Sequence, residues 1–447
     1  MKHMRHFPRQ DASGIFRAAL KAVDPYGIVE GQVDRIRRIY RDGNFERLLM
    51  ISFGKAAFPM ARALADGTGD LLGQGILITK DGHIQKERLS VGIIICEAGH
   101  PVPDFRGVRA TRRVVAALQE ASRETLVVFL ISGGGSALLV SPIKGITLEE
   151  KQEVTRLLLM AGADIGELNT VRKHISLVKG GRLAERAYPA RMISLILSDV
   201  IGDRLDVIAS GPTAPDQTTF ADALEVIDRY QIKDRIPSRA LEILMRGARG
   251  EVPETPKEKA GVFSTVENCI VGSNRMALAA AKREAMARGY EVTVLSDALR
   301  GEAREAGDRL AGQAIETRGT MGGDRKGPRC LLSGGETTVR VTGSGLGGRN
   351  TELALAFAQS IRGMQGITLL SAGTDGTDGP TDAAGAIVDG RTVERAESLG
   401  MVPEEYLKNN DSYNFLKATG DLFITGPTGT NVMDLQIILL DSESCTS

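Results

Sequence analysis

The chain lacks tryptophan altogether, and aromatic residues make up only 4% of its 447 residues. Proteins that bind single-stranded nucleic acid stack the bases on aromatic side chains, so this composition argues against that class. An excess of charge is also missing, because 56 basic residues stand against 56 acidic ones. Nucleic-acid and anionic-membrane surfaces need clustered positive charge. We therefore expect small molecules, or another copy of the chain in a homo-oligomer, as partners, and neither nucleic acid nor a membrane.

Cysteines are few and widely spaced, and no two of them form a CxxC pair: Cys96, Cys269, Cys330 and Cys445. This spacing matches no zinc-binding or disulfide pattern and is typical of proteins in a reducing compartment. Arg17 and Lys21 interrupt the apolar stretch near the N-terminus, which a signal peptide would keep uninterrupted. No apolar run approaches the roughly 18–20 residues that span a bilayer. We expect a cytoplasmic protein.

Glycine is the residue in surplus, with 52 in the chain against an average near ~7% of residues. The glycines form short clusters directly after apolar runs. Each such run is followed by a Gly-rich or polar turn and then by a helical pattern, which predicts βαβ units with parallel pairing. The runs that show this best are 48–52, 126–132, 192–198, 268–272 and 292–296. In such sheets ligands bind at the carboxyl ends of the strands, where the glycines lie.

The fold class is therefore α/β, with two α/β domains. A polar, proline-bearing stretch between Gly247 and Gly261 is typical of a linker. It predicts an N-terminal, Rossmann-like domain over residues 1–250 with a mainly parallel, doubly wound sheet, and a C-terminal domain over 262–447. In the second domain, 331–333 and 337–341 flank a Gly-Gly-Glu turn and predict a hairpin, so that sheet is expected to be mixed.

Two loops have the composition of anion sites. Lys55 stands after the strand and glycine turn of Ser52-Phe53-Gly54, at a predicted helix start where anions are favoured. The run Ser132-Gly133-Gly134-Gly135-Ser136 follows another buried strand, and consecutive glycines expose the backbone N–H donors that a phosphate nest requires. No Walker A loop can be written anywhere in the chain. The alternatives are a solvated lysine and a simple tight turn.

Two further stretches of the first domain carry charge. Asn169, Arg172 and Lys173 lie beside Gly180-Gly181 and either hold an anionic substrate or form a solvated helix face. Asp199 follows a buried strand, which suits a general base or a Mg²⁺ ligand, or else a helix cap.

The second domain offers a group around Arg349. Gly343, Gly345 and Gly348 satisfy GxGxxG, but the acidic residue expected at the end of the next strand is late, so the dinucleotide signal is weak. Arg349 follows at a helix start, where a cation opposes the macrodipole unless an anion is bound. Glu336 and Asn350 are candidate substrate ligands beside it. Asp375 and Asp378 either carry Mg²⁺ with the nucleotide or form turns, since Asp-Gly favours turns.

Many of these stretches together resemble the class II glycerate kinase family, whose C-terminal part is called the MOFRL domain. The matching blocks run in order from about residue 50 to residue 435: SFGKAA, GHPVPD, ISGGGSALL, LNTVRKHIS, KGGRLA, SDVIGD, ASGPT, VGSN, SGGETTV, GGRNTE, SAGTDGTDGPTDAAG, DSYNFL and TGPTGTNVMDL. So many blocks in register are far more specific than any one of them.

The resemblance implies ATP-dependent phosphorylation of D-glycerate at its 2-hydroxyl to give 2-phosphoglycerate, with Mg²⁺, in a cleft between the two domains. It also implies catalytic roles for Lys55 and Arg349. Some members are labelled hydroxypyruvate reductases, so an NAD(P)-dependent reductase is the alternative activity, and a non-catalytic sensor is a third.

The residues by themselves fit phosphoryl transfer, which needs positioned cations and a phosphate cradle more than covalent chemistry. Gly133–Gly135 would hold phosphates, Lys55 and Arg349 would neutralise the transferring group or the glycerate carboxylate, and Asp199 would accept the hydroxyl proton.

Overall fold

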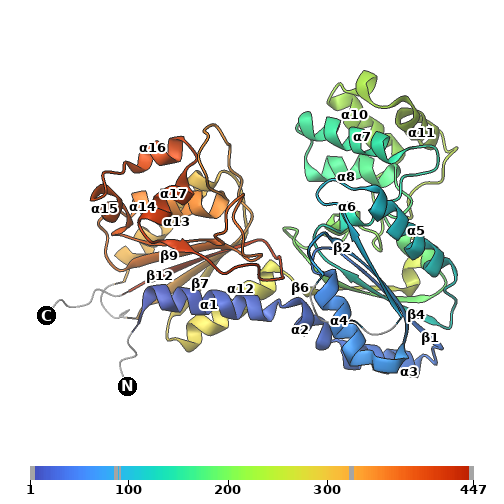
Figure 1. Cartoon of the computed structure of the whole chain (residues 1–447), viewed down its shortest axis with the longest axis horizontal. Coiled ribbons are helices and arrows are strands. Elements are labelled where there is room, and N and C mark those ends of the chain that lie inside the picture. Colours follow the sequence, from blue (N-terminus) through green and yellow to red (C-terminus); the bar gives the residue numbers. More distant parts are fainter. Residues whose placement is uncertain (1–5, 85–88, 90–91, 322–326, 442–447) are drawn as a thin grey trace. The chain divides into compact units, whose positions relative to one another are not determined.

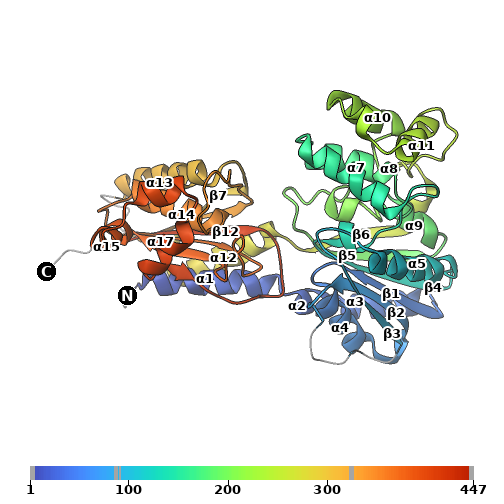
Figure 2. The ribbon, with the colours of Figure 1, turned by 45° about the horizontal axis from the view of Figure 1, so that its top comes forward.

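The computed structural model describes residues 6–84, 89, 92–321 and 327–441. It divides the chain into two compact units, residues 25–271 and residues 1–24 together with 272–447. Each unit is an α/β structure built on a six-stranded sheet (Figures 1 and 2). No helix in the described part of the chain combines the length and the apolar character needed to cross a membrane.

The sheet of unit 25–271 has the order β3-β2-β1-β4-β5-β6, and the pairs β3–β2, β2–β1, β1–β4 and β4–β5 are parallel. This is the strand order of a doubly wound, Rossmann-like sheet. The prediction of a mainly parallel first sheet is confirmed. Its strands are β1 (Arg47–Phe53), β2 (Leu72–Lys80), β3 (Ile93–Ala98), β4 (Thr125–Ile131), β5 (Arg191–Leu197) and β6 (Val266–Gly272).

Helices cover both faces of this sheet. One face carries α2, α3 and α4, and the other carries α5 and α9, while α7, α8, α10 and α11 pack together as a separate helical group (Figures 1 and 2). The helices are α2 (Pro25–Glu30), α3 (Val33–Asp42), α4 (Ala57–Thr68), α5 (Phe105–Gln119), α6 (Gly135–Leu138), α7 (Leu148–Met160), α8 (Ile165–His174), α9 (Arg182–Ala187), α10 (Phe220–Arg229) and α11 (Ser238–Ala248). Short 3₁₀ turns span 69–71, 208–210, 233–235 and 261–265.

The second sheet has the order β11-β10-β9-β12-β8-β7, with β7–β8 parallel and the other pairs antiparallel. The prediction of a mixed sheet is confirmed. Helices α1 and α12 lie against one face, and α13 and α14 pack together on the other (Figure 1). The elements are α1 (Pro8–Ala22), α12 (Asn274–Ala287), β7 (Glu291–Leu299), α13 (Ala303–Gly319), β8 (Arg329–Gly335), α14 (Arg349–Ser360), β9 (Ile367–Gly373), β10 (Gly385–Asp389), α15 (Thr392–Glu397), α16 (Pro403–Lys408), α17 (Ser412–Ala418), β11 (Leu422–Phe423) and β12 (Asp434–Leu440).

The hairpin predicted over 331–341 is wrong. β8 pairs with β7 on one edge and with β12 on the other, so no edge is left for a strand at 337–341. The segment instead makes a single bridge between Thr338 and Glu302.

The units also depart from the expected boundaries of 1–250 and 262–447 at two places. Helix α1 belongs with the second sheet, where Phe16 stacks edge-on against Phe423 and Arg9 donates to Asp389 and Asp421. Strand β6, which follows the expected linker, extends the first sheet beside β5. The linker itself packs on unit 25–271, since Pro253 O accepts from Arg182 and Thr255 donates to Asp216.

Candidate active site

The centre of the first sheet is a topological switch point. The chain passes from β1 to β2 on one side and later inserts β4 on the other side of β1. β1 and β4 run in parallel register, with Phe53 beside Ile131, and Ile131 beside Ile196 of β5. The segments that follow β1, β4 and β5 therefore emerge together, at the place where open α/β sheets bind their ligands. They carry three sets of predicted site residues: Lys55, Ser132–Ser136 and Asp199.

Backbone hydrogen bonds join the loops after β1 and β4. Lys55 N donates to Gly133 O at 2.8 Å, and Ala56 N donates to the hydroxyl of Ser132 at 3.1 Å. Gly54 has φ +127°, and a Cβ there would lie 2.1 Å from Ser132 Oγ, so only glycine fits. The lack of a side chain at Gly54 thus allows the two loops to lie in contact.

The first two glycines of the second loop make room for the surrounding functional groups. A Cβ on Gly133 would lie 2.1 Å from Asp199 Oδ2. Gly134 has φ +81°, and a Cβ there would lie 3.0 Å from the His100 ring and 3.2 Å from Lys55 Cγ. The loop is therefore closely surrounded by Lys55, Asp199 and His100, the last of which was not singled out from the sequence although it lies in the GHPVPD block.

Several polar groups at this loop have no partner among the described residues. The N–H groups of Gly133 and Gly134 find no acceptor there, and the ammonium of Lys55 makes neither a hydrogen bond nor an ion pair there. Lys55 is half-buried. An open pair of backbone donors beside an unpaired cation is the arrangement that binds phosphate.

Two titratable groups beside the loop are shifted by their surroundings. Burial raises the pKa of Asp199 above its ordinary value, and the charge of Lys55 only partly opposes this. A carboxylate with a raised pKa is a stronger proton acceptor. Burial and the charges of Lys55 and Lys80 lower the pKa of His100 to about 4, so its imidazole is neutral at pH 7.

A buried polar chain supports the loop from behind. Lys179 donates to Ser136 O at 2.7 Å and to its hydroxyl at 3.0 Å; the hydroxyls of Ser136 and Ser210 lie 2.8 Å apart, and Ser210 donates to Asn169 Oδ1 at 2.9 Å. The predicted substrate residue Asn169 is thus a buried support of the loop. Neither Lys179 nor Ser210 was identified from the sequence, although their KGGRLA and ASGPT blocks were noted.

The backbone around Ser210 has an unusual conformation. Ala209 has φ +50° and Ser210 φ +64°, both in the left-handed region that residues other than glycine seldom adopt. Such strain costs of order 1–3 kcal/mol per residue and persists mainly at functional sites. Here it points the Ser210 hydroxyl at Ser136.

Arg172 and Lys173, predicted together, have different surroundings. Lys173 is buried and pairs with buried Asp216 at 3.1 Å, a structural interaction that leaves no charge for a substrate. Burial lowers the pKa of Arg172 to about 10, and its buried Nε has no hydrogen-bond partner in the described part of the chain. Burial, followed by the charges of Arg172 and Lys151, also lowers the pKa of Lys179 well below its usual value. Arg172 therefore belongs to a group of cations without acidic partners.

Arg349 has counter-ions of its own. Its Nε and Nη2 donate to Asp434 at 2.6 and 2.8 Å, and its Nη1 lies 2.8 Å from Glu336. Asp434 is buried at the start of β12, opposite the ends of β8 and β9. Burial opposes the charge of Arg349, but hydrogen bonds to Asp434 and the charges of Asp434 and Glu336 raise its pKa above the ordinary value. The expectation that only a bound anion compensates this cation is wrong, and Asp434 was missed because it lies 85 residues further along the chain.

The residues next to Arg349 stabilise the start of α14. Asp378 accepts from Asn350 N and Thr351 N at 2.9 and 2.8 Å, and from the Thr351 hydroxyl at 2.7 Å. Asn350 is buried and accepts from Ser371. Asp378 thus caps the helix, and its carboxylate oxygens are already used. Within the described ranges the Asp375 carboxylate accepts from Thr377 N alone, at 3.1 Å, and Asp375 is less buried.

The GxGxxG glycines serve close packing. A Cβ on Gly343 would lie 2.3 Å from Asn409 O, one on Gly345 2.4 Å from Asp411, and one on Gly348 2.4 Å from Asp378. The segment before them is not a strand, whereas the dinucleotide fingerprint requires one. In a dinucleotide-binding sheet the glycines follow the first strand, and here that turn is Ser52–Ala57, which lacks the pattern.

Comparison with known proteins agrees with this geometry. Residues 11–245 match a domain of unknown function, DUF4147, and residues 329–434 match the MOFRL family. A D-glycerate 2-kinase of Thermotoga maritima is 45% identical, over 95% of this chain and 97% of that protein. The chain belongs to the glycerate 2-kinase family.

Other members of the family differ in how they are named. A crystal structure of a glycerate kinase from Thermotoga maritima superposes with a TM-score of 0.87 at 44% identity, covering 97% of this chain and 99% of that one. A protein of Agrobacterium vitis named as a hydroxypyruvate reductase is 43% identical over 97% of this chain and 94% of its own length.

Proposed function

We propose that this chain transfers the γ-phosphoryl group of ATP to the 2-hydroxyl of D-glycerate, giving 2-phosphoglycerate and ADP. The observation that carries the proposal is the switch-point loop. There the N–H groups of Gly133 and Gly134 lie beside the Lys55 ammonium, and none of these groups has a partner among the described residues. Relatives named as glycerate 2-kinases supply the identity of the acceptor. The hydroxypyruvate reductase alternative lacks a strand-borne dinucleotide loop.

Each residue has a defined task in the reaction. The loop Ser132–Ser136 holds phosphate oxygens, and Lys55 neutralises the transferring group. Asp199 accepts the proton of the glycerate 2-hydroxyl while the hydroxyl oxygen forms a bond to the γ-phosphorus. The bond from phosphorus to the β,γ-bridging oxygen breaks, and ADP leaves. Neutral His100 is available to donate a hydrogen bond to the nucleotide.

The glycerate carboxylate needs a cation, and each unit offers one candidate. In the first unit, the buried Nε of Arg172 has no hydrogen-bond partner among the residues that the structure describes. Arg349 is held rigidly by Asp434, while its other partner, Glu336, is 45% exposed and can exchange with a ligand. A bidentate anchor on one side of the guanidinium orients the other side, which reduces the ordering that binding requires.

Magnesium fits this site only in part. Asp378 is occupied as the cap of α14, whereas Asp375 retains a carboxylate for a metal. No group of three or more His, Cys, Asp or Glu residues within the described ranges forms a metal cage. Mg²⁺ usually needs only one or two carboxylates, together with substrate phosphates. Asp375 would hold the ion, which when bound neutralises charge on the phosphates.

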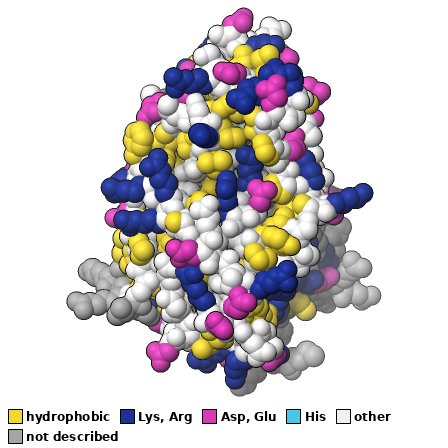
Figure 3. Space-filling view, turned by 90° about the vertical axis from the view of Figure 1, so that its right-hand side faces the viewer, with side chains coloured by type: hydrophobic (Ala, Val, Ile, Leu, Met, Phe, Trp, Pro, Cys, Tyr) yellow, Lys and Arg dark blue, Asp and Glu magenta, His cyan; other side chains and the backbone are white. Residues whose placement is uncertain are grey.

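The surface is consistent with small-molecule partners. Basic and acidic side chains are interspersed over the face shown in Figure 3, as the balanced composition predicts. We place the enzyme in the cytoplasm, where ATP is available.

The deciding experiment compares the two activities on the same preparation. Protein is incubated with D-glycerate, ATP and Mg²⁺, and separately with hydroxypyruvate and NADH, and the first product is assigned by ³¹P NMR. Glycerate-dependent ADP with 2-phosphoglycerate supports the proposal, and Lys55→Ala should lower the rate of this reaction roughly 10²–10³-fold. Oxidation of NADH without ADP formation would establish the reductase instead.

A further inference from the structure

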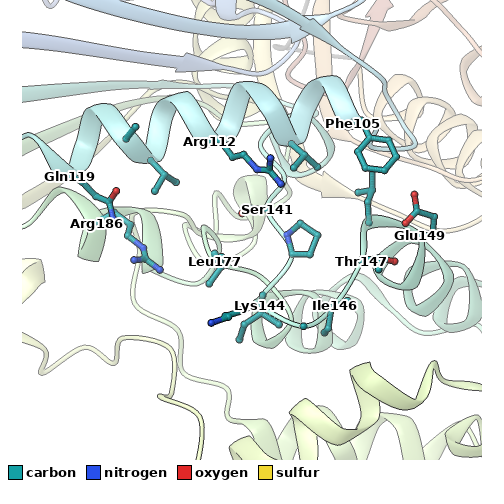
Figure 4. A pocket seen from close by; sticks show the side chains of 17 residues that line it. Phe105, Arg112, Gln119, Ser141, Lys144, Ile146, Thr147, Glu149, Leu177 and Arg186 are labelled. Carbon is teal, nitrogen blue, oxygen red and sulfur yellow. The ribbon is translucent and has the colours of Figure 1, made fainter.

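A pocket of about 620 Å³ lies on the side of α5 that faces away from the first sheet. It is lined by α5 residues spaced three or four apart, namely 105, 108, 112, 115–116 and 119, by the segment 141–149, by Leu177 and by Arg186 of α9 (Figure 4). None of the residues assigned to catalysis lines it. The volume falls in the range of ~300–1,000 Å³ that is usual for small-molecule sites.

The walls of this pocket combine apolar surface with unpaired positive charge. Phe105, Val108, Val115 and Leu177 supply apolar surface, and Phe105 is 67% exposed at the edge. Arg112, Lys144 and Arg186 form no ion pair or hydrogen bond through their side chains with any described residue.

The cations are arranged around one opening. Arg112 lies on one side and Lys144 on the other, with Leu177 between them (Figure 4). The Nε of Arg186 is buried and lacks an acceptor in the described part of the chain. A buried donor without a partner destabilises the protein, and an acceptor on a ligand would remove that cost. Glu149, exposed at the far end, is the one acidic residue that lines the pocket.

We propose that this pocket is an effector site for an organic anion with an apolar or aromatic body. The apolar walls would hold the body, and Arg112, Lys144 and Arg186 would hold its carboxylate, sulfonate or phosphate. Glycerate does not fit this description, because it has no apolar portion. The pocket therefore takes a different ligand from the active site.

The chain connects the pocket directly to the phosphate loop. Helix α6 begins within that loop at Gly135, and the residues after it form the pocket wall. Val140 N donates to Thr111 of α5 at 3.0 Å, and Ser141 O accepts from Leu177 N at 2.9 Å, which fixes the wall to α5 and to the segment that bears Lys179. A ligand in the pocket can therefore shift the segment that bears Lys179, which holds Ser136 in the phosphate loop. We expect such a ligand to change the KM for ATP.

Binding is tested with the aromatic sulfonate 8-anilinonaphthalene-1-sulfonate (ANS) and its uncharged counterpart N-phenyl-1-naphthylamine. Wild-type protein should bind ANS at one saturable site and the neutral probe more weakly. In Arg112→Ala/Lys144→Ala the affinity for ANS should fall at least about fivefold, since each exposed ion pair contributes up to ~1 kcal/mol. Arg109→Ala is the matched control, because Arg109 is exposed on the same helix and does not line the pocket. Equal ANS affinity in all three proteins, or equal affinity for both probes, would overturn the site.

The effector role rests on the proposed function and has its own readout. Saturating ANS should change the KM for ATP in the glycerate assay at least about fivefold, the lower end of allosteric couplings, and Arg112→Ala/Lys144→Ala should remove the change. An unchanged KM with ANS bound would overturn the effector role. Absence of any turnover with glycerate would count against the proposed function instead, while the ANS binding result would stand by itself.

Discussion

The cations at the ends of the two sheets differ in whether acidic side chains compensate their charge. Beside the first sheet, Lys55 and Arg172 form no ion pair with a described residue, and open backbone donors lie next to Lys55. Beside the second sheet, Arg349 is held by buried Asp434 and by Glu336. The first arrangement is complete only with an anionic ligand, whereas the second is complete in the protein alone. The first arrangement is therefore suited to binding an anion, and the second to holding its cation rigidly.

The largest effect is expected for Arg349→Ala. It removes the partner of buried Asp434, and breaking a buried pair typically costs about 3–5 kcal/mol of unfolding free energy. We expect about 3 kcal/mol, because Arg349 is itself 30% exposed. Turnover should also fall, by roughly 10²–10³-fold. Urea denaturation and steady-state kinetics measure both.

Arg362→Ala is the matched control for this variant. Arg362 pairs with Glu397 at 2.8 Å on the surface, and such pairs contribute ~0–1 kcal/mol. Arg349→Lys should restore little activity, because an ammonium cannot reproduce the bidentate contact. A fully stable Arg349→Ala protein would contradict the view that this charge is already compensated.

Lys55→Ala should separate activity from stability. Turnover should fall roughly 10²–10³-fold, because a preorganised cation is lost from the transferring phosphoryl group. Stability should change by no more than about 0.5 kcal/mol, the usual range for a residue without structural partners. A large loss of stability in this variant would show that Lys55 has a structural partner, and the contrast between the two units would fail.

Asp199→Asn should lower kcat and raise stability. Removing a general base costs ~10²-fold or more. Because burial raises the folded-state pKa of Asp199 above its unfolded value, the wild type is most favoured at low pH and loses that stability as the pH rises through the folded pKa. The gain of Asp199→Asn over wild type should therefore be present at pH 7 and shrink toward pH 4. A variant less stable than wild type at pH 7 would contradict the pKa assignment.

A smaller pair of effects distinguishes the two acidic residues of the second unit. Asp378→Ala should cost about 1–2 kcal/mol of stability through the lost helix cap. Asp375→Ala should leave stability unchanged and raise the Mg²⁺ concentration that gives half-maximal activity. If Asp378→Ala shifts the Mg²⁺ dependence and Asp375→Ala does not, Asp378 and not Asp375 is the Mg²⁺ ligand.

Local patterns in the sequence predicted much of the first site. Apolar runs without polar/apolar alternation predicted buried strands, and Lys55, Gly133–Gly135 and Asp199 follow them. The parallel register of these strands brings their ends together. Lys179 and Ser210 could not be found in this way. Their role depends on contacts to Ser136 from 43 and 74 residues away, and on a strained backbone that no composition signals.

The second site was predicted less well for a related reason. Arg349 was identified from its position at a helix start, but its partner Asp434 lies on a strand that is inserted between β8 and β9. The same insertion removed the edge needed for the expected hairpin. Helix α1 could not be assigned to the second sheet from the sequence, because its apolar stripe could pack on either sheet. Its place is set by contacts between residues some 380 positions apart in the chain.

The most direct test of the account is the affinity of a non-hydrolysable ATP analogue for Gly134→Val, measured by isothermal titration calorimetry. Gly134 has φ +81° with His100 and Lys55 against it, whereas Gly250 has φ +79° with nothing within 4 Å. Gly250→Val therefore carries the same backbone strain without touching the loop. If the loop binds phosphate through its backbone, Gly250→Val should bind the analogue like wild type, while Gly134→Val should lose at least about tenfold in affinity, or 1.4 kcal/mol. Equal affinity in the two folded variants would contradict this role of the loop.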